Sequence, residues 1–406
     1  MDRPPRGLLG APQVTTVPAT GRRARLAVVC GVSVAMTMSV QEVLPAMPVL
    51  QGVFDISDAA AGWFTLAFTL PGLLLAIPLA TLVVRLPRRS AIAGMVVVYA
   101  LLGLAQALVE SYGAMLVLRV GQGIIFAAAM PLTLVIIGES FARSEQVDAL
   151  ARRATWVTIG ELVFPIIGAL LATLSWQAPF VAQLAILPLA LLAFVVLDER
   201  RTAPTAKRQR GTTAAVIARR AHGWLILGIG FARFVFKFAF IIYVPLLVVA
   251  DSHASVAQAG VIVALSAGAT GGVAAIVPHV LRSVRASWLL VFAAAAIAMS
   301  LVGLVASNDP YESAVFAVLF GVGDGILVVL ADSYVLSAWS ADDRPRVSAA
   351  SQSARNLGKV VAPLLMSAIV AVTSLAVGLL VLAGLAVALA LAFARLRALD
   401  ERLAGT

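Results

Sequence analysis

The sequence predicts an all-α membrane protein with twelve transmembrane helices in two pseudo-symmetric six-helix bundles. The first observation is composition: 61% of the 406 residues are hydrophobic and only 12% are charged. A soluble chain of this length could not cover its surface with so few charges. The second is that the apolar runs are continuous, whereas the strands of a membrane β-barrel would alternate. The third is an internal repeat at a spacing of 198 residues.

Polar segments divide the chain into two sets of six spans of about 20 residues or more. Residues 1–25 are polar, and we expect a disordered tail, because the long apolar run that follows has no cleavage site of a signal peptide. Residues 199–222 are the predicted linker between bundles at 26–198 and 223–396, and 397–406 form a second tail. The predicted spans lie near 26–50, 59–84, 91–109, 112–138, 154–174, 178–197, 223–250, 257–281, 286–306, 312–338, 347–372 and 374–394.

The charge pattern predicts the topology. With the N-terminus in the cytoplasm, the predicted external loops contain no Lys or Arg. Because Lys and Arg collect on the cytoplasmic side, we read the net charge of +10 as topology rather than nucleic-acid binding. Both termini are then cytoplasmic, and the expected location is the plasma membrane, of the bacterial inner-membrane type. The acidic residues of the predicted external loops are Asp55, Asp58, Glu110, Asp251, Asp309 and Glu312.

Three short segments recur between the halves. Matches at nearly equal offsets predict two six-helix repeats about an axis along the membrane normal, which enclose a cavity near the midplane. The matching segments are 57–62 with 255–260 and 160–165 with 358–363, both offset by 198 residues, and 121–123 with 323–325, offset by 202.

With these motifs the chain resembles the major facilitator superfamily over 26–396, and most of all its twelve-span drug:proton antiporter branch. The fourth span contains Arg119-Val120-Gly121-Gln122-Gly123, similar to the Arg-x-x-Gln-Gly element of that family. In the fifth span, Pro165 and Gly168 resemble its Gly-Pro-x-x-Gly-Gly motif. The resemblance implies secondary transport by alternating access, with Arg119 in proton coupling. Gly160, Pro165 and Gly168 allow a kink and close helix approach.

The loop after the second span departs from the family pattern. Arg85, Arg88 and Arg89 keep the basic residues of the family's gating loop, but Val84 stands at its acidic position. An Asp there would pair with the other bundle and latch the outward-open state. We therefore expect this latch to be weak or absent.

Nine charged residues lie inside the predicted spans, although each costs roughly 3 kcal/mol at a helix centre. Such groups usually face the interior, pair with one another and mark ion or substrate paths. Arg233 and Lys237, four residues apart, share one helix face. At 1.5 Å per residue, Glu161, Lys237, Asp324 and Lys359 fall near the midplane, Glu42 and Arg119 toward the outside, and Asp332 and Arg355 toward the cytoplasm.

Two interpretations of these charges remain open: ion pairs that only fix helix packing, or groups that bind protons and solute. A carboxyl in a low-dielectric cavity can load and release a proton. The proton-coupling candidates are Glu42, Glu161, Arg119 and Asp324. The substrate-cavity candidates are Arg233, Lys237, Lys359, Gln122 and Trp156.

The predicted function is proton-coupled export of a small organic, drug-like compound. The alternative is proton-coupled uptake of an organic anion, because the C-terminal half contains four interior bases and two acids. A sensor or scaffold that transports nothing is the third hypothesis. We expect a monomer in the lipid bilayer whose partners are a small solute and protons. No catalytic constellation, nucleotide-binding loop or metal-ligand cluster stands out, so we expect no enzyme activity, no cofactor and no metal.

Overall fold

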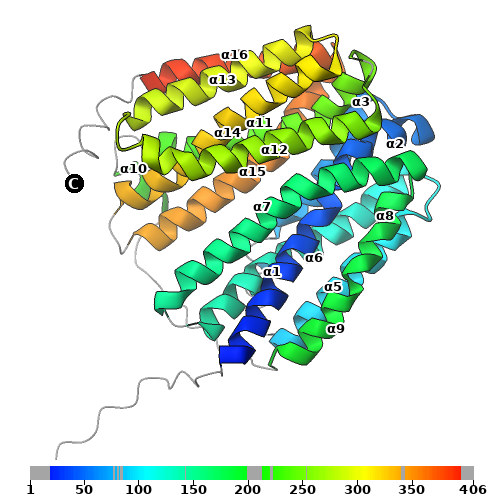
Figure 1. The fold of residues 1–406 in the computed structure, drawn as a ribbon, viewed down its shortest axis with the longest axis vertical. Helices are drawn as coiled ribbons and strands as arrows, with labels where there is room; N and C mark the ends of the chain where they lie inside the picture. Colours follow the sequence, from blue (N-terminus) through cyan, green and yellow to red (C-terminus); the bar gives the residue numbers. More distant parts are fainter. Residues whose placement is uncertain are drawn as a thin grey trace, which may run out of the picture.

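The computed structural model describes residues 19–75, 78–79, 82, 86–141, 143–198, 213–219, 223–252, 254–339 and 343–394. All regular elements in these ranges are helices (Figure 1). The N-terminal half contains α1 (Ala19–Gln41), η1 (Leu44–Ala46), α2 (Met47–Phe54), α3 (Asp58–Leu74), α5 (Arg88–Gln106), α6 (Tyr112–Ser140), α7 (Arg143–Leu174), α8 (Ala178–Ala182), η2 (Gln183–Ile186) and α9 (Leu187–Val196). After α10 (Thr213–Ala218), the C-terminal half contains α11 (Gly223–Ala250), α12 (Val256–Val280), α13 (Ala286–Ala306), α14 (Pro310–Ala338), α15 (Arg344–Val370) and α16 (Leu375–Ala394).

Ten helical segments of the described residues are long and apolar enough to cross a membrane, as expected of a multi-pass membrane protein. Two of the predicted spans are not among them. Helix α3 is described for only 17 residues, and α15 contains several charges, including Arg355 and Lys359. Both nevertheless pack as bundle members, α3 against α6 and α15 against α11. The count of twelve spans therefore stays a prediction.

The first predicted span is interrupted near its end. Helix α1 ends at Gln41, Glu42 and Val43 form a turn, and the chain continues through η1 and α2. Pro45 and Pro48 explain the break, because proline has no N–H and its ring clashes with the preceding turn of a helix. The break places Glu42 at a bend in the chain rather than within a continuous helix.

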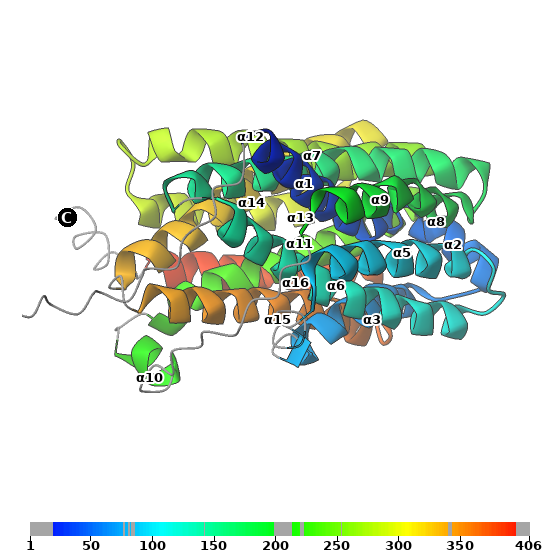
Figure 2. The ribbon, with the colours of Figure 1, turned by 90° about the horizontal axis from the view of Figure 1, so that it is seen from below.

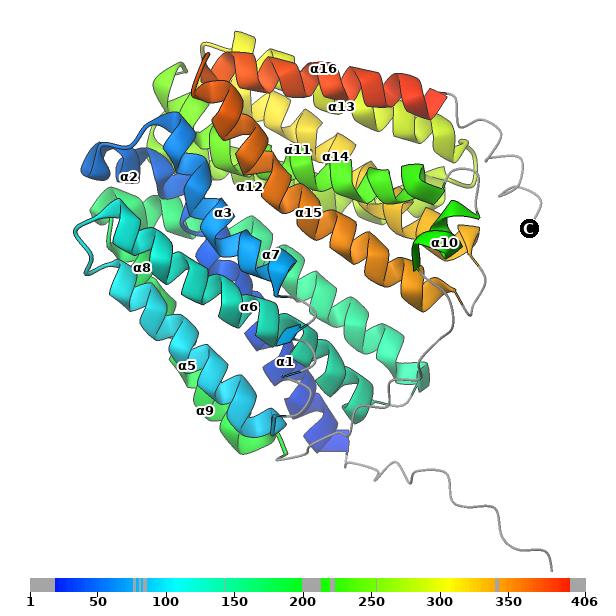
Figure 3. The same cartoon turned by 180° about the vertical axis from the view of Figure 1, so that it is seen from behind.

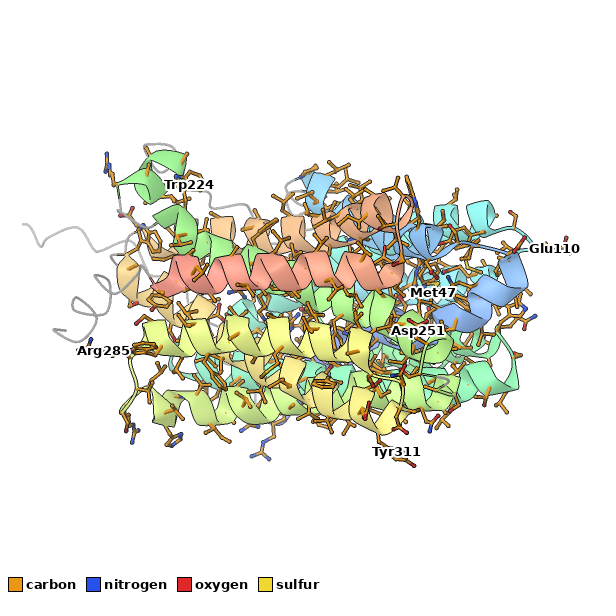
Figure 4. All side chains as sticks on the ribbon, turned by 90° about the horizontal axis from the view of Figure 1, so that it is seen from above. Met47, Glu110, Trp224, Asp251, Arg285 and Tyr311 are labelled. Carbon is orange, nitrogen blue, oxygen red and sulfur yellow. The ribbon has the colours of Figure 1, made fainter. Side chains whose placement is uncertain are left out.

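The loops gather at two opposite ends of the molecule. Figure 4 shows Glu110, Asp251 and Tyr311 toward one end, which we call the acidic end, and Trp224 and Arg285 toward the other, the basic end. The acidic end contains the turns after α2, α5, α7, α11, α13 and α15. The predicted separation of acidic from basic loops is therefore present in the fold.

The two halves join at the acidic end. One cluster of buried apolar side chains lies wholly within the N-terminal half. The other fills the C-terminal half and takes in acidic-end residues of the N-terminal half, among them Leu44, Met47, Phe64 and Phe180. Figure 1 shows the ribbons of the halves converging at the acidic end and diverging toward the basic end.

The repeated segments make two equivalent helix crossings between the halves. Ser57 and Ser255 cap the N-termini of α3 and α12, and each is followed five residues later by a glycine, Gly62 or Gly260. Helix α3 packs on α15, as Figure 3 shows, and α12 packs on α7.

Both glycines are required by contact with the opposite half. A Cβ at Gly260 would overlap Ala169 and the carbonyl oxygen of Pro165. A Cβ at Gly62 would overlap Ser367 and Tyr243, and Ser367 donates to the Ala59 carbonyl at 2.7 Å. Since Pro165 and Ala169 correspond to Pro363 and Ser367 at the 198-residue offset, the acidic end is closed by two pseudo-symmetric contacts.

Candidate functional site

Six of the nine interior charges form ion pairs, and all six lie on helices α7, α11, α14 and α15. Two of the pairs, Lys237–Glu161 and Arg355–Asp332, join residues that the sequence placed at similar depth. The pairs are Arg233–Asp324, with Nε 2.7 Å from Oδ1, Lys237–Glu161, with Nζ 2.8 Å from Oε2, and Arg355–Asp332.

The Lys237–Glu161 pair joins the two halves. Glu161 lies on α7 and Lys237 on α11, and their side chains are 28% and 12% exposed. Beside the pair is a small cavity, large enough for about one water molecule, lined from both halves by residues that include Gln41, Thr270 and Phe320. The pair is therefore a polar contact between the halves, next to a small cavity that both halves line.

The Arg233–Asp324 pair belongs to the C-terminal half alone. Asp324 is 2% exposed and also accepts a hydrogen bond from the Thr270 hydroxyl at 3.3 Å. Arg233 donates to Oδ2 of Asp324 at 3.0 Å and lies 4.8 Å from the centroid of the Phe234 ring. Arg233 thus neutralises the charge of Asp324, which also lines the small cavity beside the Lys237–Glu161 pair.

Lys359 has no anionic partner in the described part of the chain. Its ammonium lies 4.9 Å from the centroid of the Phe234 ring and 6.0 Å from that of Phe238. The ionised groups that act on it are three cations, Lys237, Arg233 and Arg355, and one anion, Glu161. We call the three ion pairs and Lys359 the central cluster, and because each pair is neutral, its excess positive charge lies at Lys359.

Arg119 is held within the N-terminal half by hydrogen bonds. It is 1% exposed and donates to the Ser39 carbonyl at 2.6 Å, the Ser39 hydroxyl at 3.1 Å and the Gln122 side-chain oxygen at 2.8 Å. The Phe64 ring centroid lies 4.0 Å from its guanidinium carbon. These contacts fix a buried cation where the sequence predicted one.

Glu42 is the second interior charge without a partner. It is fully buried, and neither carboxylate oxygen has a hydrogen-bond partner among the described residues. Arg119 is the cation that acts on it. Gly168 of α7 packs directly on the Glu42 backbone, because a Cβ there would overlap the Glu42 carbonyl. A buried carboxyl group left unpaired is costly when ionised, which favours proton binding.

Two residues expected at the substrate cavity lie elsewhere. Gln122 is fully buried within the N-terminal half, where its amide donates to Gln183 at 2.8 Å and to the Tyr99 carbonyl at 3.1 Å. Trp156 is 53% exposed and lines a groove on the outer face of α1, α7 and α9. Depth along a helix was predictable, whereas the face that each side chain presents was not.

The gating-loop residues that are described make contacts within the N-terminal half. Arg88 is 2% exposed and pairs with Glu139 of α6 at 2.9 Å, and Arg89 lies 3.8 Å from the Phe194 ring centroid of α9. Arg85 and Val84 lie outside the described residues. Gly160 packs on Val34 and Phe164, as expected of a packing position.

A buried amide network around Arg119 went unnoticed in the sequence. Gln106 donates to Gln122 at 2.9 Å, and the Tyr99 hydroxyl lies 2.6 Å from that of Ser39. Three glutamines in three apolar helices are the signal that could have revealed it, because a buried amide needs partners.

Among the described residues no group of three or more His, Cys, Asp or Glu could hold a metal ion.

The inter-half ion pair gives a direct prediction. Glu161→Gln and Lys237→Met should each destabilise the contact by about 1–3 kcal/mol, the range for hydrogen bonds to charged groups. The exchanged pair, Glu161→Lys with Lys237→Glu, should recover much of this loss. Thermal unfolding of the wild type, the two single variants and the double variant Glu161→Gln/Lys237→Met forms a double-mutant cycle that measures the coupling, with Arg22–Glu145, a pair within one half, for comparison. A coupling near zero would contradict the assignment of this pair as an inter-half contact.

Comparison with known proteins agrees with this architecture. A bacterial homologue of the human lysosomal transporter Spinster, in an inward-facing and unoccupied conformation, superposes with a TM-score of 0.75 at 16% identity, covering 95% of this chain and 98% of that one. A mutant form of the nucleoside transporter NupG gives 0.78 at 13% identity, covering 93% and 100%. No curated protein sequence matches significantly. The family profile described as Major Facilitator Superfamily matches residues 27–327 and 225–406. The chain belongs to the Major Facilitator Superfamily of membrane transporters.

Proposed function

We propose that the protein is a proton-coupled secondary transporter that moves a small organic compound by alternating access, with export as the expected direction. The observation that carries the proposal is Glu42, a fully buried carboxyl without a hydrogen-bond partner in the described residues, under the charge of Arg119. Export is supported by the resemblance of Pro165 and Gly168 to an antiporter motif.

The two unpartnered charges belong to different halves. Glu42 lies in the N-terminal half, whereas Lys359 lies in the C-terminal half beside the inter-half pair. This separation supports two distinct binding sites, one for the proton in the N-terminal half and one for the solute at the central cluster. Glu161 can couple the two, because protonation or a competing anion would release Lys237 from it.

A proton-release measurement tests the coupling. In antiport, solute binding displaces the proton, so adding solute to the detergent-solubilised protein in weak buffer should release protons from the wild type. Glu42→Gln should bind the solute with little release. Equal proton release from both proteins would remove Glu42 as the proton site.

The second candidate is proton-coupled uptake of an organic anion, and Lys359 is the observation that favours it. Loss of a contact between an ammonium and a bound carboxylate should weaken binding by about tenfold to hundredfold. We expect Lys359→Met to weaken an anionic solute by this factor and a matched neutral analogue by less than about threefold. Titration of both analogues measures the difference. Equal weakening would assign Lys359 to packing over Phe234 and would remove the support for an anionic solute.

A further inference from the structure

An apolar groove of about 480 Å³ lies on an outer face of the N-terminal half. Helices α1, α7 and α9 lie together on that face in Figures 1 and 2. The lining side chains are apolar except for Cys30, and they include Ala27, Val34, Met38, Trp156, Phe164 and Leu189. None of the interior charges discussed above lines it, so the groove is separate from the central cluster.

The length of the groove matches one leaflet. Along α1 it runs from Ala27 to Met38, which is about 17 Å at 1.5 Å per residue. Half of a hydrocarbon core of about 30 Å is about 15 Å. An acyl chain lying in the groove would therefore reach from the bilayer midplane to the headgroup region.

Two arginines lie at the basic end of the groove. Arg23 precedes Ala27 by four residues on α1, and Arg152 precedes Trp156 by four residues on α7, so each continues a lining face. The charge of Arg152 acts on Cys30 in the groove wall. Both arginines are exposed, and neither forms an ion pair or hydrogen bond within the part of the chain that the structure describes.

Neighbouring arginines are already neutralised or buried. Arg22 pairs with Glu145 at 2.8 Å and Arg25 with Asp198 at 2.5 Å. Arg153, next to Arg152, points inward and donates to the Ser33 hydroxyl at 2.7 Å. Arg23 and Arg152 are thus cations without an ion pair at this end of the groove, within the described ranges, with Asp148 one turn before Arg152 on α7, and guanidinium groups bind phosphate well.

We infer that this groove is a binding site for an anionic glycerophospholipid. One acyl chain lies along Val34, Trp156 and Phe164, and the headgroup phosphate lies between Arg23 and Arg152. A zwitterionic lipid fits the apolar wall equally well but adds its own cation beside two arginines. Two basic residues near an anionic surface give a preference of roughly tenfold to thirtyfold for the anionic lipid.

Trp156 provides the test, because brominated acyl chains quench tryptophan fluorescence on contact. The full-length protein is reconstituted in phosphatidylcholine with increasing fractions of brominated phosphatidylglycerol or brominated phosphatidylcholine. Subtracting the signal of Trp156→Phe isolates Trp156 from the other five tryptophans. We expect half-quenching at a roughly tenfold lower fraction of the anionic lipid, and loss of this preference in Arg23→Gln/Arg152→Gln.

Two controls keep the inference falsifiable. Arg282→Gln/Arg285→Gln removes the same charge from the basic end of the other half and should retain the preference. Ala185→Phe fills the groove, leaves both arginines in place and should reduce quenching by both lipids. Equal quenching of the wild type by both lipids, equal loss in the two double variants, or unchanged quenching in Ala185→Phe would each overturn the site.

Discussion

Replacing Glu42 with glutamine is expected to reduce solute transport driven by a pH gradient to background. Glutamine has nearly the same shape and stays neutral at every pH, so it imitates the protonated acid but cannot release a proton. Because Glu42 is fully buried and without a hydrogen-bond partner in the described residues, the neutral amide should not destabilise the fold. Solute exchange without a gradient should persist, since it needs no proton transfer. Both fluxes are measured in proteoliposomes with labelled solute.

The matched control is Glu110→Gln. Glu110 lies in an exposed turn at the acidic end, so the change removes the same charge without touching the interior. It should leave gradient-driven flux within about twofold of the wild type, as expected of an exposed surface charge. Full gradient-driven flux in Glu42→Gln would exclude Glu42 as the proton carrier, and loss of exchange as well would indicate a structural role.

The second large effect is expected at the two crossings that close the acidic end. Gly260→Leu inserts a side chain against Ala169 and Pro165, and Gly62→Leu inserts one against Ser367. Overpacking of this kind costs about 1–3 kcal/mol, which changes the ratio of the closed to the open acidic end by about fivefold to 150-fold. The added side chain destabilises only the conformation in which the halves meet at the acidic end. Both variants should therefore populate mainly the conformation with the acidic end open, and should transport solute roughly tenfold more slowly.

Accessibility of a single cysteine reports this shift. Val263→Cys lies beside the inter-half cavity, and in a Cys30→Ala background it is the only thiol. A membrane-impermeant maleimide added at the acidic-end side should label it faster in Gly260→Leu than in the parent. Gly272→Leu, on the same helix with no atom within 4 Å of an added Cβ, should label at the parental rate. Unchanged labelling in Gly260→Leu would contradict closure by these contacts.

Much of the architecture was predictable because the physical signals are local in the sequence. Apolar runs located the helices, and the 198-residue repeat picked out the Ser-capped helix starts and the Gly and Pro positions that form the crossings. The break after Gln41 was not predicted, although Pro45 and Pro48 were available to indicate it. Helix α15 was predicted as a helix of the bundle despite its charges, since the segment after Lys359 is almost wholly apolar.

The site was less predictable, because pairing depends on which helix faces meet. Depth grouped Glu161 with Lys237, but nothing local in the sequence shows that these two residues join the halves while Arg233 and Asp324 pair within one half. For the same reason Trp156 was expected at the cavity and lies on the outer groove. That Glu42 and Lys359 lack a partner among the described residues could not be predicted, because it depends on the contacts that the other interior charges make in the fold.

Solute flux through the wild-type protein, in liposomes with an imposed pH gradient, tests proton-coupled transport. A panel of neutral, cationic and anionic organic compounds is compared with and without a protonophore. We expect accumulation of at least one compound that follows the gradient, reverses when the gradient is reversed and collapses with the protonophore. Flux that is indifferent to the gradient, or no flux for any compound of a broad panel, would contradict it, and the latter result would favour a sensor or scaffold.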